Sequence, residues 1–168
     1  MSKADLFFDS SALFAGVVSA SGASRALLIL AERGQVAVTV SEQVIAETER
    51  AIARKATRAL PAYRETVRHT GLRIVRDPSP EDVRAHPHLI RHQADVSIVL
   101  AAMQAKADYL VTLNRRHFID DADVTVRSGL RIGLPGDALA WVREMLASSG
   151  TLSEFFGQSP PANADPDS

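Results

Sequence analysis

The chain has 168 residues and a mass of 18.1 kDa, with 46% hydrophobic and 23% charged residues and a formal net charge of -1. This composition is typical of one globular domain and excludes a disordered or collagen-like chain. There are no cysteines, so disulfides, thiolate nucleophiles and zinc–thiolate sites are excluded.

In chain order we expect a strand at 6–8, helices at 11–17 and 26–31, a strand at 35–40, helices at 42–57 and 62–69, a strand at 72–75 and helices at 81–84 and 94–107. Strands at 109–112 and 124–126 and a helix at 138–145 follow. Gly34 closes the second helix, Pro61 falls just past the third, and His117 lies in a loop. Strands that alternate with helices predict an α/β fold with a mostly parallel sheet.

The composition changes near the end of the chain. From Ser148 onward Ser, Gly, Pro, Asn and Asp dominate, so we expect a domain at 1–147 and a polar, disordered tail at 148–168. No apolar run reaches the roughly 20 residues that span a bilayer. Asp5 and Asp9 interrupt the first apolar stretch, which therefore does not resemble a signal peptide. We expect a cytoplasmic protein without membrane contact.

The charge is unevenly distributed. Residues 50–91 contain nine arginines and one lysine against four acidic residues, a net charge of +6, whereas no basic residue follows Arg143. Arginine binds phosphate through its planar guanidinium, so the basic segment can face nucleic acid. Solvated helix faces explain the same charge, and both interpretations stay open at this point.

Several familiar catalytic patterns are absent. The sequence has no phosphate-binding G-x-x-x-x-G-K-[ST] loop, no G-x-G-x-x-G fingerprint, no H-E-x-x-H zinc motif and no G-x-S-x-G elbow. His86, His88 and His92 are close in sequence, but they do not share a helical face across Pro87. We therefore do not expect these three histidines to form a metal site.

Polar residues occupy three positions where a functional site is common. Asp9 directly follows a buried strand and Asn114 follows another by two residues, and ligands bind beyond the carboxyl ends of parallel strands. Asp95 opens the most apolar helix, where a buried carboxylate requires a cation. Each has a structural alternative: Asp9 as a helix cap, Asp95 as an acidic first-turn residue and Asn114 as a turn former.

Glu47 lies in the helix after the second strand, at the border of its inner face. Glu49 occupies the opposite border of the same face. Periodicity alone does not choose between them, and each is also explained as a solvated helix residue.

Taken in order, these residues resemble the PIN-domain ribonucleases over residues 5–147. The matching pieces are a strand followed by D-S-S at 9–11, a strand and helix with an internal acid at Glu47, and D-V-S-I-V-L-A-A leading into A-D-Y-L-V-T-L-N. The block from Asp95 to Thr112 is the most specific. The resemblance implies a three-layer α/β/α fold around a mostly parallel sheet.

The resemblance also implies a catalytic set of Asp9, Glu47, Asp95 and Asn114. The first three match the family's acidic ligands for Mg²⁺ or Mn²⁺, and Asn114 stands where the family commonly has Asp. This change removes one charge and puts a second metal in doubt, although one branch carries the Thr-x-Asn seen here at 112–114. Asp120 and Asp121 follow closely and are possible replacements. Substrate contacts are expected from Ser10, Arg50, Arg54 and Arg115.

The implied activity is metal-dependent endonucleolytic cleavage of RNA. The resemblance extends to VapC-type toxins, which implies a small antitoxin partner and a homodimer. The alternative is a catalytically weak PIN-like module that binds RNA or protein, which Asn114 favours and the three acids disfavour. An unrelated α/β phosphoesterase ranks last because of the spacing around Asp95.

Overall fold

The computed structural model describes residues 3–150, and one five-stranded sheet runs through them. Its strands are β1 (Ala4–Phe8), β2 (Val36–Ser41), β3 (Arg73–Val75), β4 (Tyr109–Val111) and β5 (Arg131–Gly133). The strand order is β3-β2-β1-β4-β5, and every pairing is parallel. The predicted parallel sheet is therefore confirmed.

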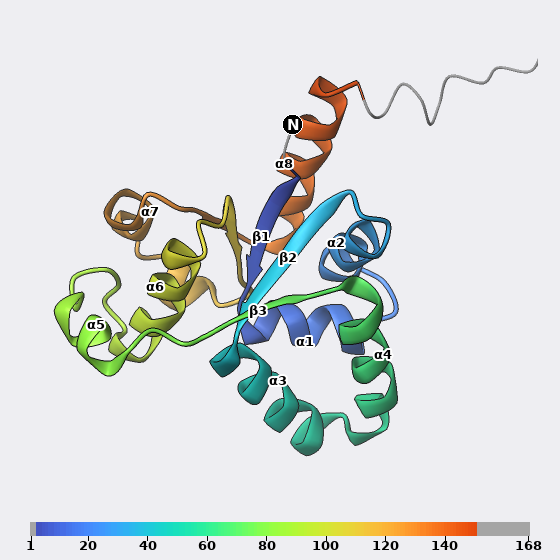
Figure 1. Cartoon of the computed structure of the whole chain (residues 1–168), viewed down its shortest axis with the longest axis horizontal. Helices are drawn as coiled ribbons and strands as arrows, with labels where there is room; N and C mark the ends of the chain where they lie inside the picture. Colours follow the sequence, from blue (N-terminus) through green and yellow to red (C-terminus); the bar gives the residue numbers. More distant parts are fainter. Residues whose placement is uncertain (1–2, 151–168) are drawn as a thin grey trace, which may run out of the picture.

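Helices cover both faces of this sheet (Figure 1). One layer contains α1 (Ser10–Val18), α2 (Ala23–Glu32), α3 (Glu42–Lys55), α4 (Leu60–Thr70) and α8 (Pro135–Ser148). The other contains α5 (Pro80–Ala85), α6 (Val96–Gln104) and α7 (Asp123–Ser128). Within the first layer, α1 contacts α2 and α3, and α2 contacts α4 and α8. The arrangement is the three-layer α/β/α fold that the resemblance implied.

The core lies around β1 and α6. Leu6, Phe7 and Phe8 of β1 are fully buried, because this central strand has a paired strand on each side and helices on each face. The buried residues of α6 lie on nearly every side of the helix: Val96, Ile98, Val99, Leu100, Ala101 and Ala102. Polar groups that flank these two elements are consequently held close to the apolar interior.

The side on which strands are added to the sheet changes at β1, although β1 and β4 are parallel. From β1 the chain crosses to β2 on one side, whereas β4 pairs with the other side of β1 and leads on to β5. Such a switch point opens a crevice at the carboxyl ends of the two strands, and α/β proteins bind ligands there. Asp9 follows β1, and the segment from Thr112 to Asn114 follows β4, so both border this crevice.

Side-chain caps begin several helices where the sequence suggests them. Asp9 accepts a hydrogen bond from the Ala12 amide at the start of α1, and Ser41 accepts one from the Val44 amide at the start of α3. Ser79 does the same for α5. Gly34 follows α2 with a φ of +71°, a conformation that costs glycine little. These caps fix where each helix leaves the edge of the sheet.

The prediction fails in the segment after β4. Residues 124–126 form part of α7 rather than a strand, with Val124 buried and Val126 83% exposed. Burial on one helical face overrides the preference of the β-branched residues for strands. The strand β5 follows instead, and its sequence R-I-G gave little strand signal because it has one β-branched residue between an arginine and a glycine.

Three smaller expectations also change. Pro61 lies in the first turn of α4, where proline is well tolerated, and does not mark the gap before that helix. His117 belongs to a helical segment, Arg115–Ile119, instead of a loop. The long helix predicted at 94–107 is shorter, because a 3₁₀ turn, Gln93–Asp95, precedes α6.

In residues 3–150 no single helix is both long and apolar enough to cross a membrane. The pair α1 and α2 meets that test together, but the two helices are bent by 85° relative to each other. The polar tail predicted at 148–168 lies largely outside the described residues.

Candidate functional site

Asp9 directly follows β1 at the switch point of the sheet and is only 6% exposed. Its Oδ1 accepts hydrogen bonds from the Ala12 amide (2.9 Å) and the Ser11 hydroxyl (2.7 Å), and its Oδ2 accepts one from the Thr112 hydroxyl. Burial raises the pKa of the Asp9 carboxyl, and these three hydrogen bonds oppose that shift only in part. No cationic side chain of residues 3–150 forms an ion pair with Asp9.

Glu47 projects from α3 toward the start of α1. The Ser10 hydroxyl donates to Glu47 Oε2 (2.9 Å), and the Gln43 side-chain amide donates to Oε1 (2.8 Å). Gln43 in turn accepts a hydrogen bond from the Ser97 hydroxyl of α6 (2.6 Å). Glu49 instead accepts from the Tyr63 hydroxyl in α4, on another side of the helix. The structure thus distinguishes two glutamates that periodicity could not.

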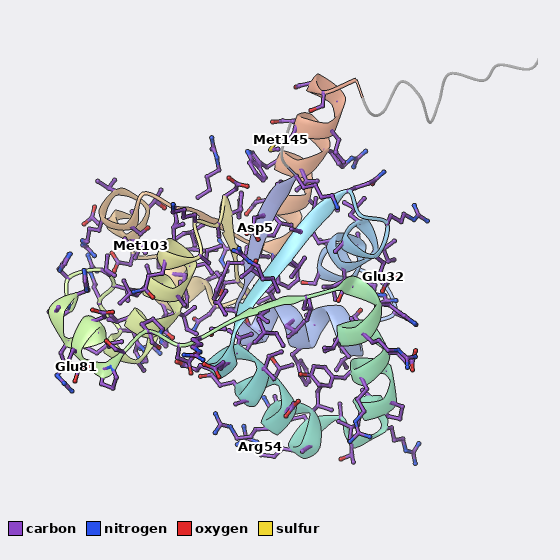
Figure 2. The ribbon with its side chains drawn as sticks, viewed as in Figure 1. Asp5, Glu32, Arg54, Glu81, Met103 and Met145 are labelled. Atoms are coloured by element: carbon purple, nitrogen blue, oxygen red, sulfur yellow. The ribbon has the colours of Figure 1, made fainter. Side chains whose placement is uncertain are left out.

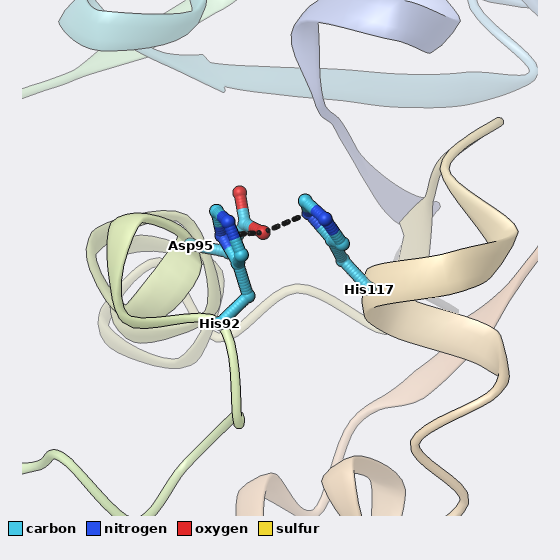
Figure 3. A group of neighbouring side chains, drawn as sticks. All are labelled: His92, Asp95 and His117. Carbon is cyan, nitrogen blue, oxygen red and sulfur yellow. Dashed lines mark hydrogen bonds and ion pairs between the residues drawn. The ribbon is translucent and has the colours of Figure 1, made fainter.

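Asp95 is the N-cap residue of α6, and its side chain is 19% exposed. Its Oδ2 lies 2.7 Å from His117 Nδ1 and 3.0 Å from His92 Nδ1. In the view of Figure 3, one Asp95 oxygen lies between the two imidazoles and has a dashed line to each. The two rings stack, with their centroids 3.7 Å apart and their planes 17° from parallel.

Asn114 supports this part of the crevice from the end of β4. Its Oδ1 accepts from the His117 amide (3.2 Å) and caps the segment Arg115–Ile119, while its Nδ2 lies 3.0 Å from His117 Nδ1. The Thr112 hydroxyl that contacts Asp9 also accepts from the Asn114 amide (2.9 Å). Asn114 therefore links Asp9, through Thr112, to the histidine that contacts Asp95.

The four predicted catalytic residues are brought to the same edge of the sheet. Glu47 contacts Ser10, the neighbour of Asp9 in sequence, and Asn114 is linked to Asp9 through Thr112. The negative charge of Asp95 is close enough to Asp9 to contribute to the raised pKa of the Asp9 carboxyl, after the larger effect of burial. Three carboxyl groups, from the end of β1, from α3 and from the start of α6, thus lie at one edge of the sheet.

The predicted substrate residues are distributed differently. Ser10 belongs to the crevice through its contact with Glu47, whereas Arg50, Arg54 and Arg115 are exposed at the surface. Arg54 extends from the outer side of α3 near its end (Figure 2). None of the three arginines lines the two hollows that border the acidic residues in the described part of the chain.

A basic residue that the sequence did not single out lines one of these hollows. Lys55, at the end of α3, lines a hollow of about 350 Å³ together with Ser10, Ser11, Leu113 and other residues. A second hollow of about 430 Å³ is lined by Arg91, His92, Arg116, His117, Asp120 and Asp121. Each of the two hollows is therefore lined by at least one basic side chain.

His92 and His117 are the functional candidates that sequence reasoning missed. His92 lies three residues before Asp95, and His117 three residues after Asn114, but the two are 25 positions apart in the chain. Their convergence depends on the start of α6 lying next to the segment Arg115–Ile119. The grouping of His86, His88 and His92 is not seen: among the described residues, His92 instead joins Asp95 and His117, and the ligand atoms of these three lie within 4.8 Å of one another.

Comparison with known proteins identifies the family. A family model described as PIN domain matches residues 5–116, which includes Asp9, Glu47, Asp95 and Asn114. The chain belongs to the PIN domain family. A search of curated proteins finds no match.

Solved structures share the fold. PAE2754 from Pyrobaculum aerophilum is similar with a TM-score of 0.53 and 17% sequence identity, over 84% of this chain and 96% of that one. VapBC2 from Rickettsia felis, bound to a DNA fragment from its promoter, has a TM-score of 0.55 and 15% identity, over 77% of this chain and 98% of that one. At these identities the likeness concerns the fold alone.

Proposed function

We propose that this protein is a metal-dependent endoribonuclease whose catalytic residues are Asp9, Glu47, Asp95 and Asn114. The observation that carries the proposal is the placement of three carboxyl groups at one edge of the sheet, with the most buried of them, Asp9, lacking a cationic partner among the described residues. PIN domains are generally nucleases that use divalent metals. Family membership and the chemistry of the crevice therefore agree.

The donor set fits Mg²⁺ or Mn²⁺. These hard cations prefer oxygen ligands and bind through one or two carboxylates together with water. Asp9, Glu47 and Asp95 would hold the cation, and a cation there would offset the burial of the Asp9 charge and its repulsion by Asp95. When bound, such a metal supplies an activated water and stabilises charge on the scissile phosphate.

The chain's own residues position these groups. The Ser11 and Thr112 hydroxyls orient the Asp9 carboxylate, and the Ser10 hydroxyl orients that of Glu47. Lys55 lies beside Ser10 and is placed to contact a backbone phosphate of the substrate. Arg50, Arg54 and Arg115 extend the basic surface over which an RNA strand would run.

We further propose that the protein acts in the cytoplasm as the toxin of a toxin–antitoxin pair and forms a homodimer. The likeness in fold to the VapBC2 structure supports a small antitoxin as partner. The alternative of a weakly catalytic binding module rests on Asn114, whose side-chain oxygen caps the segment Arg115–Ile119 and carries no charge.

The two glutamates of α3 provide a matched test. Glu47→Gln and Glu49→Gln make the same chemical change two residues apart in one helix, but only Glu47 contacts Ser10 at the crevice. We expect wild-type protein to cleave labelled single-stranded RNA with Mg²⁺ or Mn²⁺ and not with EDTA. Glu47→Gln should lose most of this cleavage, and Glu49→Gln should retain it.

Equal cleavage by both variants would remove Glu47 from the site. RNA binding without cleavage by the wild-type protein in both metals would favour the binding module. A parallel reaction with single-stranded DNA of the same sequence tests whether RNA is the substrate.

A further inference from the structure

The two stacked histidines beside Asp95 form a cluster with its own chemistry. The Nδ1 atoms of His92 and His117 lie 3.0 and 2.7 Å from the same oxygen, Asp95 Oδ2 (Figure 3). The ligand atoms of all three residues lie within 4.8 Å of one another. Asp95 Oδ1 accepts no hydrogen bond from residues 3–150, so one side of this carboxylate serves the histidines and the other remains available to the crevice.

Asn114 restricts which form of His117 fits this arrangement. Its Oδ1 accepts from the His117 backbone amide, so its Nδ2, which can only donate, faces His117 Nδ1 at 3.0 Å. The same Nδ1 lies 2.7 Å from Asp95 Oδ2. One ring nitrogen can accept from Asn114 or donate its proton to Asp95, but it cannot do both, so one of the two contacts is left unsatisfied in the metal-free protein.

A divalent transition metal is the group that these ligands select. Two imidazole nitrogens and one carboxylate oxygen are a donor set typical of Zn²⁺ and other transition metals, whereas Mg²⁺ prefers oxygen alone. Metal–ligand bonds of about 2.0–2.2 Å put neighbouring ligand atoms roughly 3.0–3.5 Å apart. The two Nδ1–Oδ2 distances, 3.0 and 2.7 Å, are close to this range. Because the two rings are stacked with nearly parallel planes, one ring must turn before both Nδ1 atoms can point at the same ion.

The surroundings allow a cation to enter. His92 and His117 line the hollow of about 430 Å³, and the His92 side chain is 48% exposed, so its ring can turn to bring Nδ1 toward a metal. Two arginines line the same hollow. Arg91 is paired with the carboxylate of Asp121 (3.7 Å), and Arg116 is exposed, so water screens its charge.

We propose that His92, Asp95 and His117 form a binding site for a divalent transition metal, with Zn²⁺ as the best-suited ion. This site is distinct in its ligand chemistry from the oxygen-only centre of Asp9 and Glu47, and it shares Asp95 with that centre.

The test uses the full chain, freed of metal with EDTA and dialysed. Co²⁺ is titrated and followed by visible absorption, which reports nitrogen ligation, and Zn²⁺ is then added in competition. The variants are His92→Ala and His117→Gln, and the control is His88→Ala, an exposed histidine four residues from His92 that is outside the cluster. We expect affinity for Co²⁺ and Zn²⁺ to fall at least about tenfold in both variants and to stay within twofold in the control.

Unchanged affinity in both His92→Ala and His117→Gln, or an equal loss in His88→Ala, would overturn the proposal. If circular dichroism shows that His117→Gln does not fold, the metal affinity of His92→Ala alone tests the proposal, since the His92 side chain is half-exposed. The readout contains no RNA. A wild-type protein that binds Zn²⁺ through both histidines but cleaves no RNA would therefore contradict the nuclease proposal and support this one.

Discussion

Two buried aspartates in this fold, Asp9 and Asp121, have opposite electrostatic surroundings. Asp9 is 6% exposed and Asp121 is 4% exposed. Burial raises the pKa of the Asp9 carboxyl, which has hydroxyl and amide donors but no cation. Burial also acts to raise the pKa of Asp121, but the Arg91 amide and the guanidinium groups of Arg127 and Arg91 outweigh it and hold that pKa below its ordinary value.

The difference separates a structural carboxylate from one that requires an outside cation. The charge of Asp121 is matched by Arg127 (3.4 Å) and Arg91 (3.7 Å), so the protein itself satisfies it. Because these two arginines already pair with Asp121, its carboxylate is poorly suited to replace the missing fourth acid. The charge of Asp9 is left unmatched by residues 3–150 and is opposed by Asp95. A metal ion is the partner we propose for it.

The largest expected effect is the loss of RNA cleavage when the charge of Asp9 is removed. Asp9→Asn keeps the shape of the side chain but removes the charge that a metal needs, so we expect RNA cleavage to fall by more than about 100-fold. Asp5→Asn is the control, because Asp5 lies at the other end of β1 and contacts Thr39 and Arg73 instead. Initial rates in Mn²⁺ measure the effect. Cleavage by Asp9→Asn within threefold of wild type would refute the assignment.

Substitution of Asp121, whose charge is paired with arginines, should lower the stability of the protein and leave its activity unchanged. Asp121→Ala removes the acceptor of the Arg91 amide and the partner of Arg127, and we expect a loss of about 2 kcal/mol of unfolding free energy. For a chain of this size this lowers the melting temperature by roughly 4–8 °C. Urea unfolding gives the free energy, and cleavage per folded molecule should be retained. A stable but inactive Asp121→Ala protein would place Asp121 in the catalytic site after all.

The two aspartates should also give opposite pH dependences in EDTA. The folded pKa of Asp9 is raised above the reference value of 3.8, so its contribution to stability is full below that pH and is lost as the pH rises through the folded pKa. The folded pKa of Asp121 is lowered, so its contribution is present above 3.8 and is lost as the pH falls through the folded pKa.

Melting temperatures of two asparagine variants test these signs. The advantage of Asp9→Asn over wild type should grow by a few degrees as the pH rises above about 4. The deficit of Asp121→Asn should be greatest in that same range and shrink at lower pH. Parallel curves for the two variants would show that their surroundings do not differ as the structure indicates.

The smallest effect concerns Asn114. Asn114→Asp adds a carboxylate beside the other acids, and divalent affinity depends on ligand charge, so we expect Mn²⁺ to bind about threefold more tightly. Both Asn and Asp accept the cap hydrogen bond from the His117 amide, so the backbone should not change. Calorimetric titration of both proteins measures the difference. Equal affinities would limit Asn114 to shaping the turn.

The sequence predicts most of the fold and the unusual position of Asp9, because the end of a buried strand is visible as a local pattern. Glu47 could be separated from Glu49 only by the resemblance, since the contact with Ser10 joins residues 37 positions apart. His117 was missed for the same reason: its partner Asp95 lies in another element. The strand predicted at 124–126 was wrong because burial of Val124 on one helical face outweighed local preference.

The most direct measurement is a Mn²⁺ anomalous difference map from crystals grown with the metal. Our account predicts a peak within coordinating distance of carboxylate oxygens from Asp9 and Asp95, with Glu47 as a direct or water-mediated ligand, and no peak at Asp121. A protein that cleaves RNA in Mn²⁺ but shows its only peak away from Asp9 would contradict the account.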